Sequence, residues 1–315
     1  MDRASRVILS ACVLILSLAG CAPRPASATV RIGVLPLLDA LPMYVAQAEG
    51  YFADAGVSVE FIPAASAAER DQLMQSRQID GMINDLVSTM LYNRAGQEIV
   101  VVRLARTATA EFPQYRILAS PKSTVDTPQD LAGVPIGISE GTVIAYITDR
   151  LLEAEGLSPD QITTIAVPSI ADRMALLSSG ELEAATLPDP LSSLALQAGA
   201  RVVVDDTAHP ELGLSLISFR AAFVQNSPEA VRAFLAAVER AVEAVNADKN
   251  RWSNILTEEQ LVPAPIIGEY VIPDFPAGSV PTEAQFADVL AWTRTKGLIQ
   301  GDVYYDVSVD ASFLP

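Results

Sequence analysis

Short runs of aliphatic and β-branched residues alternate with longer segments of helical periodicity from residue 30 to about residue 205. This alternation is typical of α/β folds with parallel strands. The first series predicts strands and helices in alternation: strands Val30–Leu35, Val57–Ile62, Gly81–Ile83 and Ile99–Leu104, and helices Met43–Asp54, Ala68–Arg77 and Leu86–Ala95. A second series predicts strands Val134–Ile138, Thr164–Val167, Ala184–Leu187 and Arg201–Val204, and helices Val143–Glu155, Ala171–Ser178 and Leu191–Ala198. No strict repeat is visible, yet the pattern predicts two similar α/β lobes in tandem.

After the second series, the pattern of hydrophobic and polar residues changes. Leu214–Arg220 predicts a connecting strand, and the clearest helix of the chain follows, with Ser227 as N-cap and Pro228 at its first position. Its apolar residues recur at helical spacing, which predicts a stripe facing the core: Val231, Phe234, Leu235, Val238, Val242 and Val245. A last helix is predicted at Glu283–Thr295.

This order of elements predicts two lobes with a cleft between them. We expect lobe 1 to comprise residues 29–117 and 218–315, and lobe 2 to comprise residues 118–217. Crossover strands near Arg116–Pro121 and Leu214–Arg220 would join the lobes and allow hinge closure on a ligand.

The first 28 residues have the pattern of an export signal. Basic Arg3 and Arg6 precede an apolar run that, at about a dozen residues, is too short to span a bilayer. The ending Leu18-Ala19-Gly20-Cys21 resembles the lipobox of bacterial lipoproteins. We therefore predict a signal peptide over residues 1–20, lipidation of Cys21 and a linker to residue 28, which would hold the protein on the extracytoplasmic face of the cell membrane. A plain secretory signal is the alternative.

The net charge and the cysteine content narrow the class of protein further. The formal net charge is −17, and loss of the signal removes one acid and two bases, which gives −18. Such a chain lacks the clustered Lys and Arg that nucleic acids or anionic lipids require, so lipid would be its only membrane attachment. The cysteines are Cys12 in the signal and Cys21. No disulfide is therefore expected.

The chain has few of the residues and motifs that are typical of catalytic and metal-binding sites. The single histidine, His209, lies next to Pro210 in a predicted loop. The chain contains no CxxC, HExxH or EF-hand motif, and Gly137–Gly141 lacks the spacing of a dinucleotide fingerprint. We expect no metal, no cofactor and no catalytic residues, which favours a binding protein over an enzyme.

Several segments together resemble the solute-binding proteins of ABC importers, in the group that binds sulfonates, nitrate, taurine and thiamine pyrimidines. They are Arg31-Ile32-Gly33-Val34, Ala48-Glu49-Gly50-Tyr51-Phe52, Gly56–Glu60, Asp80–Asp85, Glu98–Val100, Asp130–Gly137, Gly180–Ala185 and Asn226-Ser227-Pro228-Glu229. The resemblance implies a two-lobed fold of the periplasmic-binding-protein type with two crossover strands and a central cleft. It also implies a monomer that delivers its solute to a permease and an ATPase.

In such folds, solutes contact the loops after strand C-termini and the N-termini of helices. The polar residues of these loops are the predicted ligand-binding residues: Asp39, Tyr44, Asn84, Asp85, Thr107, Ser139, Glu140, Thr142 and Asp189. Asp, Ser and Thr also cap helices and turns where no ligand is present, and Tyr44 could pack under the first helix.

The loop carboxylates bear on the solute's charge. Asp39, Asp85, Glu140 and Asp189 would repel an anion, and Arg106 would offset only part of their charge. A neutral nutrient, with hydroxyls for these acids and a ring covered by Tyr44 and nearby leucines, is predicted instead. A vitamin such as riboflavin is the leading candidate. The alternatives are a thiamine-pyrimidine precursor, an organic anion such as a sulfonate, or another class altogether, a lipid-anchored sensor or enzyme on the same fold.

Overall fold

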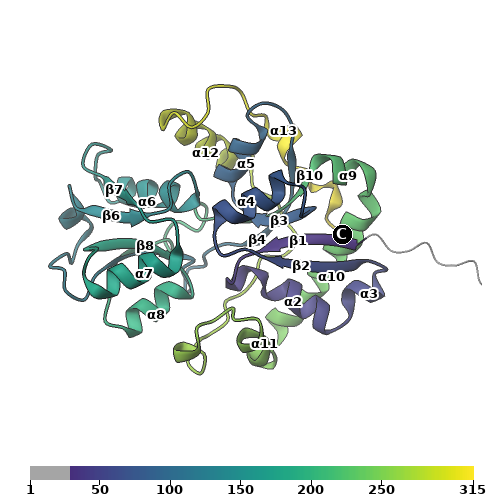
Figure 1. The fold of residues 1–315 in the computed structure, drawn as a ribbon, viewed down its shortest axis with the longest axis horizontal. Helices are drawn as coiled ribbons and strands as arrows, with labels where there is room; N and C mark the ends of the chain where they lie inside the picture. Colours follow the sequence, from purple (N-terminus) through teal and green to yellow (C-terminus); the bar gives the residue numbers. More distant parts are fainter. Residues whose placement is uncertain (1–28) are drawn as a thin grey trace, which may run out of the picture.

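The computed structural model describes residues 29–315, and these form two lobes that lie side by side (Figure 1). The predicted signal peptide, Cys21 and the linker lie outside the described residues. Each lobe is built on a five-stranded mixed sheet with helices on both faces (Figure 1). Within residues 29–315, no helix combines the length and the apolar character needed to cross a membrane.

The sheet of lobe 1 has the strand order β2-β1-β3-β10-β4. Its strands are β1 (Thr29–Val34), β2 (Ser58–Pro63), β3 (Gly81–Asn84), β4 (Ile99–Arg106) and β10 (Ser215–Arg220). The helices between them are η1 (Leu38–Ala40), α2 (Leu41–Ala48), α3 (Tyr51–Asp54), α4 (Ala67–Gln75) and α5 (Leu86–Asn93). Strand β10 runs antiparallel to both of its neighbours.

The sheet of lobe 2 repeats this arrangement in the order β7-β6-β8-β5-β9. Its strands are β5 (Tyr115–Ala119), β6 (Pro135–Ile138), β7 (Thr163–Ala166), β8 (Ala184–Pro188) and β9 (Arg201–Asp205). Its helices are η2 (Pro128–Leu131), α6 (Val143–Ala154), α7 (Ile170–Ser179) and α8 (Leu191–Gln197). Here β5 is the antiparallel strand.

The rest of the chain after β10 is helical and irregular. Its elements are α9 (Ala221–Asn226), α10 (Pro228–Ala247), η3 (Lys249–Trp252), α11 (Ser253–Glu258), η4 (Ala264–Ile266), α12 (Glu283–Thr295), α13 (Tyr305–Ser308) and η5 (Ala311–Phe313). The predicted stripe of α10 is confirmed, because all six of its residues are buried. Phe234 of this stripe stacks on Phe52 at 5.3 Å between ring centroids and meets Phe219 edge-on at 5.5 Å.

The predicted α/β alternation is confirmed, with three local differences. Strands β5 and β10, in the regions where the crossover strands were expected, each follow a crossing and run antiparallel to both of their neighbours. The helix expected at Met43–Asp54 is two helices, separated at Gly50, whose φ of 73° favours glycine. Ser227 precedes α10 as expected, but its side chain makes no capping hydrogen bond.

The lobe boundaries lie slightly away from the expected positions. Strand β5 begins at Tyr115 and belongs wholly to the sheet of lobe 2, and β10 begins at Ser215 and belongs wholly to that of lobe 1. The crossings are therefore residues 107–114 and 206–214, whereas boundaries after residues 117 and 217 would cut through both strands.

Beyond the crossings, α12 of the C-terminal segment contacts α6 of lobe 2. Asp149 of α6 accepts a hydrogen bond from the Trp292 indole N–H at 2.7 Å and pairs with Lys296 Nζ at 2.7 Å. Arg150, also of α6, forms an ion pair with Asp288 at 2.8 Å. These contacts connect α6 of lobe 2 to α12 of the C-terminal segment.

Asp206 joins the two crossings to each other. Its Oδ1 accepts the backbone N–H of Gln114 at 2.9 Å and that of Tyr115 at 3.1 Å. The residue is fully buried, and its Oδ2 has no hydrogen-bond partner within the described residues. Burial raises the pKa of Asp206 from 3.8 to about 6, although the two N–H donors oppose this shift.

This raised pKa predicts a pH-dependent stability. Folded Asp206 holds its proton to a higher pH than the unfolded chain, so its contribution to the free energy of unfolding is present below pH 4 and is lost as the pH rises through 6. We expect Asp206→Asn to remove this loss, so that the variant gains up to about 3 kcal/mol on wild type between pH 4 and pH 8 in urea unfolding. Asp205→Asn is the control, and a gain that does not change with pH would contradict the assignment.

Candidate ligand-binding site

A cavity of about 70 Å³ lies between the lobes and is lined by both of them. The lining from lobe 1 is Leu35, Leu37, Asp39, Ala67, Arg70, Ile83, Asn84, Asp85 and Ser215. The lining from lobe 2 is Tyr115, Ser139, Thr142, Val143, Ile144, Pro168, Ile170, Arg173 and Pro188. Most of these residues follow the C-terminal ends of strands, where the predicted loops were expected to converge.

The structure brings five of the nine predicted ligand-binding residues to this cavity: Asp39, Asn84, Asp85, Ser139 and Thr142. Several of them also have local roles. Asp85 caps α5 by accepting the N–H of Ser88 at 2.8 Å, and Thr142 caps α6 by accepting that of Ile144 at 3.2 Å. The Asn84 side-chain oxygen accepts the hydroxyl of Ser218 at 2.7 Å. Capping therefore accounts for part of the polar pattern without a solute.

The other four predicted residues lie elsewhere. Tyr44 packs against Phe61, at 4.7 Å between ring centroids, in a separate groove of lobe 1. Thr107 donates its hydroxyl to the Pro210 carbonyl at 2.5 Å, and Glu140 is exposed. Asp189 lines a second, more open cavity of about 500 Å³. Tyr44 is thus placed where it could not cover a ring in the interlobe cavity.

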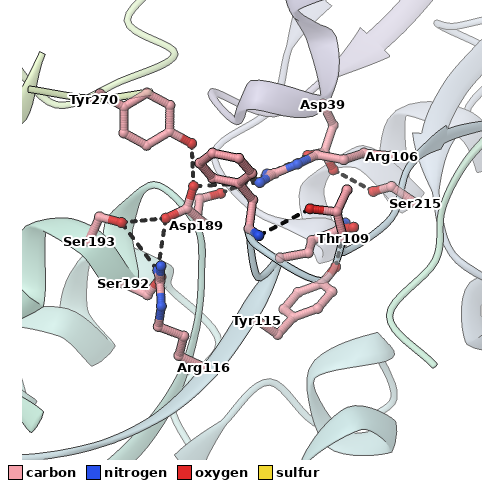
Figure 2. A network of polar contacts seen from close by, with 12 residues as sticks. Asp39, Arg106, Thr109, Tyr115, Arg116, Asp189, Ser192, Ser193, Ser215 and Tyr270 are labelled. Atoms are coloured by element: carbon pink, nitrogen blue, oxygen red, sulfur yellow. Dashed lines mark hydrogen bonds and ion pairs between the residues drawn. The ribbon is translucent and has the colours of Figure 1, made fainter. Parts of the chain in front are cut away.

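Asp39 and Asp189 belong to one buried ionic network with Arg106, which Figure 2 shows. Arg106 is 1% exposed and lies between them, with Nη1 3.4 Å from Asp39 Oδ1 and Nη2 3.5 Å from Asp189 Oδ2. Ser215 donates its hydroxyl to Asp39. The network connects η1 and β4 of lobe 1 to the end of β8 in lobe 2.

Asp189 has further partners from both lobes. Arg116 of β5 contacts its Oδ1 at 2.9 Å, Ser193 donates a hydroxyl at 2.5 Å, and Tyr270 of the C-terminal segment donates its phenol (Figure 2). Burial raises the pKa of Asp189, but the charges of Arg106 and Arg116 outweigh burial and hold this pKa below its usual value. Asp189 is therefore a fully paired carboxylate.

These ion pairs change the expectation for two of the four loop carboxylates that were expected to repel an anion, Asp39 and Asp189. Arg106 and Arg116 together balance Asp39 and Asp189, and Glu140 is exposed. Asp85 differs from these three, because it lines the cavity, is 4% exposed and forms no ion pair within the described residues, and burial raises its pKa. Arg116 was overlooked because it lies within a strand, whereas the expectation considered only loops. Paired charges project little field into the cavity.

Sequence reasoning also missed two cationic residues of the cavity wall. Arg70 of α4 and Arg173 of α7 both line it, and they are only 4% and 0% exposed. Both lie in the first turn of a helix, and only loop residues had been considered. A usable signal was present, because Ser66-Ala67-Ala68-Glu69-Arg70 and Ser169-Ile170-Ala171-Asp172-Arg173 share the pattern Ser-x-Ala-acid-Arg.

Two sheets with exchanged antiparallel strands, two crossings and a cavity between the lobes define a two-lobed protein of the periplasmic-binding-protein fold. Residues 38–251 match the family described as NMT1/THI5 like. The chain belongs to this family, because the match covers more than half of it.

One known protein resembles the chain in sequence over most of this chain's length. It is 27% identical over 277 residues to the nitrate import ATP-binding protein NrtC of Synechococcus elongatus, a match that covers 81% of this chain and 41% of that relative. The chain therefore spans less than half of the relative's length.

Two solved structures show the same fold. The alkanesulfonate-binding protein SsuA from Xanthomonas axonopodis pv. citri, bound to MOPS, superposes with a TM-score of 0.74 at 18% identity, over 92% of this chain and 99% of that one. The desulfurization enzyme DSZB superposes with a TM-score of 0.69 at 16% identity, over 90% and 97% of the two chains. The fold alone thus accommodates both binding proteins and an enzyme.

The buried network yields a prediction about stability. Asp189→Ala would leave Arg116 and part of the Arg106 charge buried without a partner, so we expect the free energy of unfolding to fall by about 3–5 kcal/mol in urea titrations. The matched control is Asp126→Ala, which removes the acid of an exposed pair with Arg201 and should cost less than about 1 kcal/mol. Equal losses in the two variants would show that the network contributes no more than a surface pair.

Proposed function

We propose that this chain is the solute-binding component of an ABC importer and that it delivers a small nutrient to a permease and its ATPase. The observation that carries the proposal is the cavity between the lobes, which takes its wall from both. The family match and the fold shared with an alkanesulfonate-binding protein support it. A nitrate import protein among the relatives supports an import system in particular.

The proposed mechanism is capture by closure. A solute that contacts both lobes stabilises the arrangement in which they are close together, because an open form offers only half of these contacts. The crossings at residues 107–114 and 206–214 would act as the hinge. The permease would then distinguish the closed, loaded protein from the open, empty one.

Closure can be measured by small-angle scattering on the purified protein without its signal. We expect the radius of gyration to decrease when a bound solute from a panel of nitrate, MOPS and riboflavin is added, because the lobes approach each other. Calorimetry on the same samples establishes which solutes bind. Saturation without compaction would contradict closure, and conversion of a solute to product, followed by mass spectrometry, would favour an enzyme on this fold.

A neutral vitamin such as riboflavin, the solute favoured by the sequence, is one candidate for the nutrient. The apolar side chains of Leu35, Leu37 and Ile83 favour it, because they could cover a ring system in the cavity. Asp39, however, already accepts from Ser215 and pairs with Arg106, so it has little capacity left for the hydroxyls of a polyol tail.

We also propose that Cys21 carries a lipid that anchors the protein to the extracytoplasmic face of the cell membrane. The support is the sequence Leu18-Ala19-Gly20-Cys21 after a basic and apolar start. In cell fractionation, Cys21→Ser is expected to release the protein from membranes or to leave an unprocessed precursor. Cys12→Ser is the matched control and should change neither. Unaltered membrane association of the Cys21 variant would exclude the anchor.

A further inference from the structure

Arg70 and Arg173 occupy matching places in the two lobes. Each lies four residues after the serine that caps its helix, Ser66 for α4 and Ser169 for α7. Each serine side chain accepts a backbone N–H at 3.2 Å. The two lobes therefore position an arginine in the first turn of a helix by the same local device.

The main-chain contacts of the two arginines also correspond. Arg70 donates from Nη1 to the carbonyl of Ile83 at 3.1 Å, and Arg173 donates from Nε to that of Thr186 at 2.9 Å. Ile83 and Thr186 are each the third residue of a central strand, β3 in lobe 1 and β8 in lobe 2. Both guanidinium groups are therefore held at the same height on their sheets, beside the interlobe cavity.

Each arginine passes over a glycine of the neighbouring strand. A Cβ at Gly33 in β1 would lie 3.7 Å from Cγ of Arg70, and one at Gly137 in β6 would lie 3.3 Å from Cγ of Arg173. At both glycines, the Cβ would also come within 2.6 Å of an aliphatic side chain. Both sheets thus have a glycine, which lacks a side chain, at the place where the arginine and an aliphatic side chain pack closely.

The lobes differ in the counter-charge. Asp71 follows Arg70 and pairs with it at 2.8 Å, but the corresponding residue after Arg173 is Met174. Within residues 29–315, Nη2 of Arg173 has no hydrogen-bond partner, and the guanidinium forms no ion pair. Its Nη1 and Nε donate to main-chain carbonyls, Val167 at 2.6 Å and Thr186 at 2.9 Å. Burial lowers the pKa of Arg173 to about 10, which leaves it charged at neutral pH. A buried charge without an opposite charge beside it is destabilising.

We propose that Arg173 is the residue of the interlobe cavity that binds an anionic group of the solute. The solute would supply to Arg173 the negative charge that Asp71 supplies to Arg70. Ser139, which precedes the twelve-residue helix α6, lines the same cavity, and its hydroxyl is a donor that suits an anion. The hydroxyl of Thr142 also lines the cavity, but it already donates to the Ser139 carbonyl at 2.8 Å. This inference rests on the proposed function and names the residue that would hold the charge of the solute.

The test is to supply the missing carboxylate from the protein. Met174→Asp places an acid at the position that matches Asp71, and Met174→Asn is the control of nearly equal shape without charge. We expect Met174→Asp to weaken binding of MOPS, nitrate or acetate, whichever binds wild type, by about ten- to hundredfold in calorimetry, because the internal acid competes for Arg173. Met174→Asn should stay within about threefold of wild type.

Thermal unfolding without solute gives a second readout that does not depend on the identity of the solute. An acid beside an unpaired buried guanidinium should raise the melting temperature of Met174→Asp above that of Met174→Asn at pH 7, and the difference should vanish as the acid is protonated. Equal melting temperatures together with equal anion affinities would overturn the assignment of Arg173.

The outcomes separate this inference from the proposed function. If wild type closes on riboflavin and binds none of the anions, the importer component stands and the anionic solute is wrong. If anions bind without closure and Met174→Asp weakens them, the anion site stands and capture by closure is wrong. If binding of every anion is unaffected by Met174→Asp, Arg173 does not hold them.

Discussion

The buried charge of Arg106 is the constraint on which the junction of the two lobes depends. This guanidinium lies at the end of β4, where the chain leaves lobe 1, and its acids come from opposite lobes, Asp39 from one and Asp189 from the other. Removing a charge from water costs several kcal/mol unless partners of opposite charge are held in place. The loop after β1 and the loop after β8 must therefore approach β4 together, and this approach also brings the ends of their strands to the interlobe cavity.

Contacts outside the cavity reinforce the same arrangement of the lobes. Asp206 holds the two crossings together through Gln114 and Tyr115, so rotation of one crossing must involve the other. On α6, Asp149 reaches the C-terminal segment through Trp292 and Lys296. Opening of the cleft would have to break or stretch these contacts, whereas a bound solute would favour their retention. If the lobes close on a solute as proposed, the energy difference between open and closed forms would be distributed over the hinge, the network and α12.

The two lobes share a plan but differ in charge where they face each other. Similar helix caps, strand contacts and glycines place Arg70 and Arg173 equivalently, yet of these two arginines only Arg70 forms an ion pair within the described residues. In a low-dielectric interior, one missing carboxylate changes the preference of a cavity more than several paired charges do. A single difference between matching positions, Asp71 and Met174, therefore distinguishes an arginine that pairs with the acid next to it from one that does not.

The sequence by itself determined the elements, the order of the lobes and the class of fold, because hydrophobic periodicity and capping residues are local signals. The bounds of α12 follow directly from Glu283–Thr295, and five predicted residues reach the cavity because strand ends converge in any such fold. Only the tertiary structure decided which charges are compensated. Arg106 meets Asp189, 83 positions along the chain, and Arg173 forms no ion pair within residues 29–315; neither fact is visible in local spacing. The expectation of a neutral solute counted loop acids without their distant partners, and long-range pairing in a desolvated interior is the physical reason why the sequence could not show which of these acids are compensated.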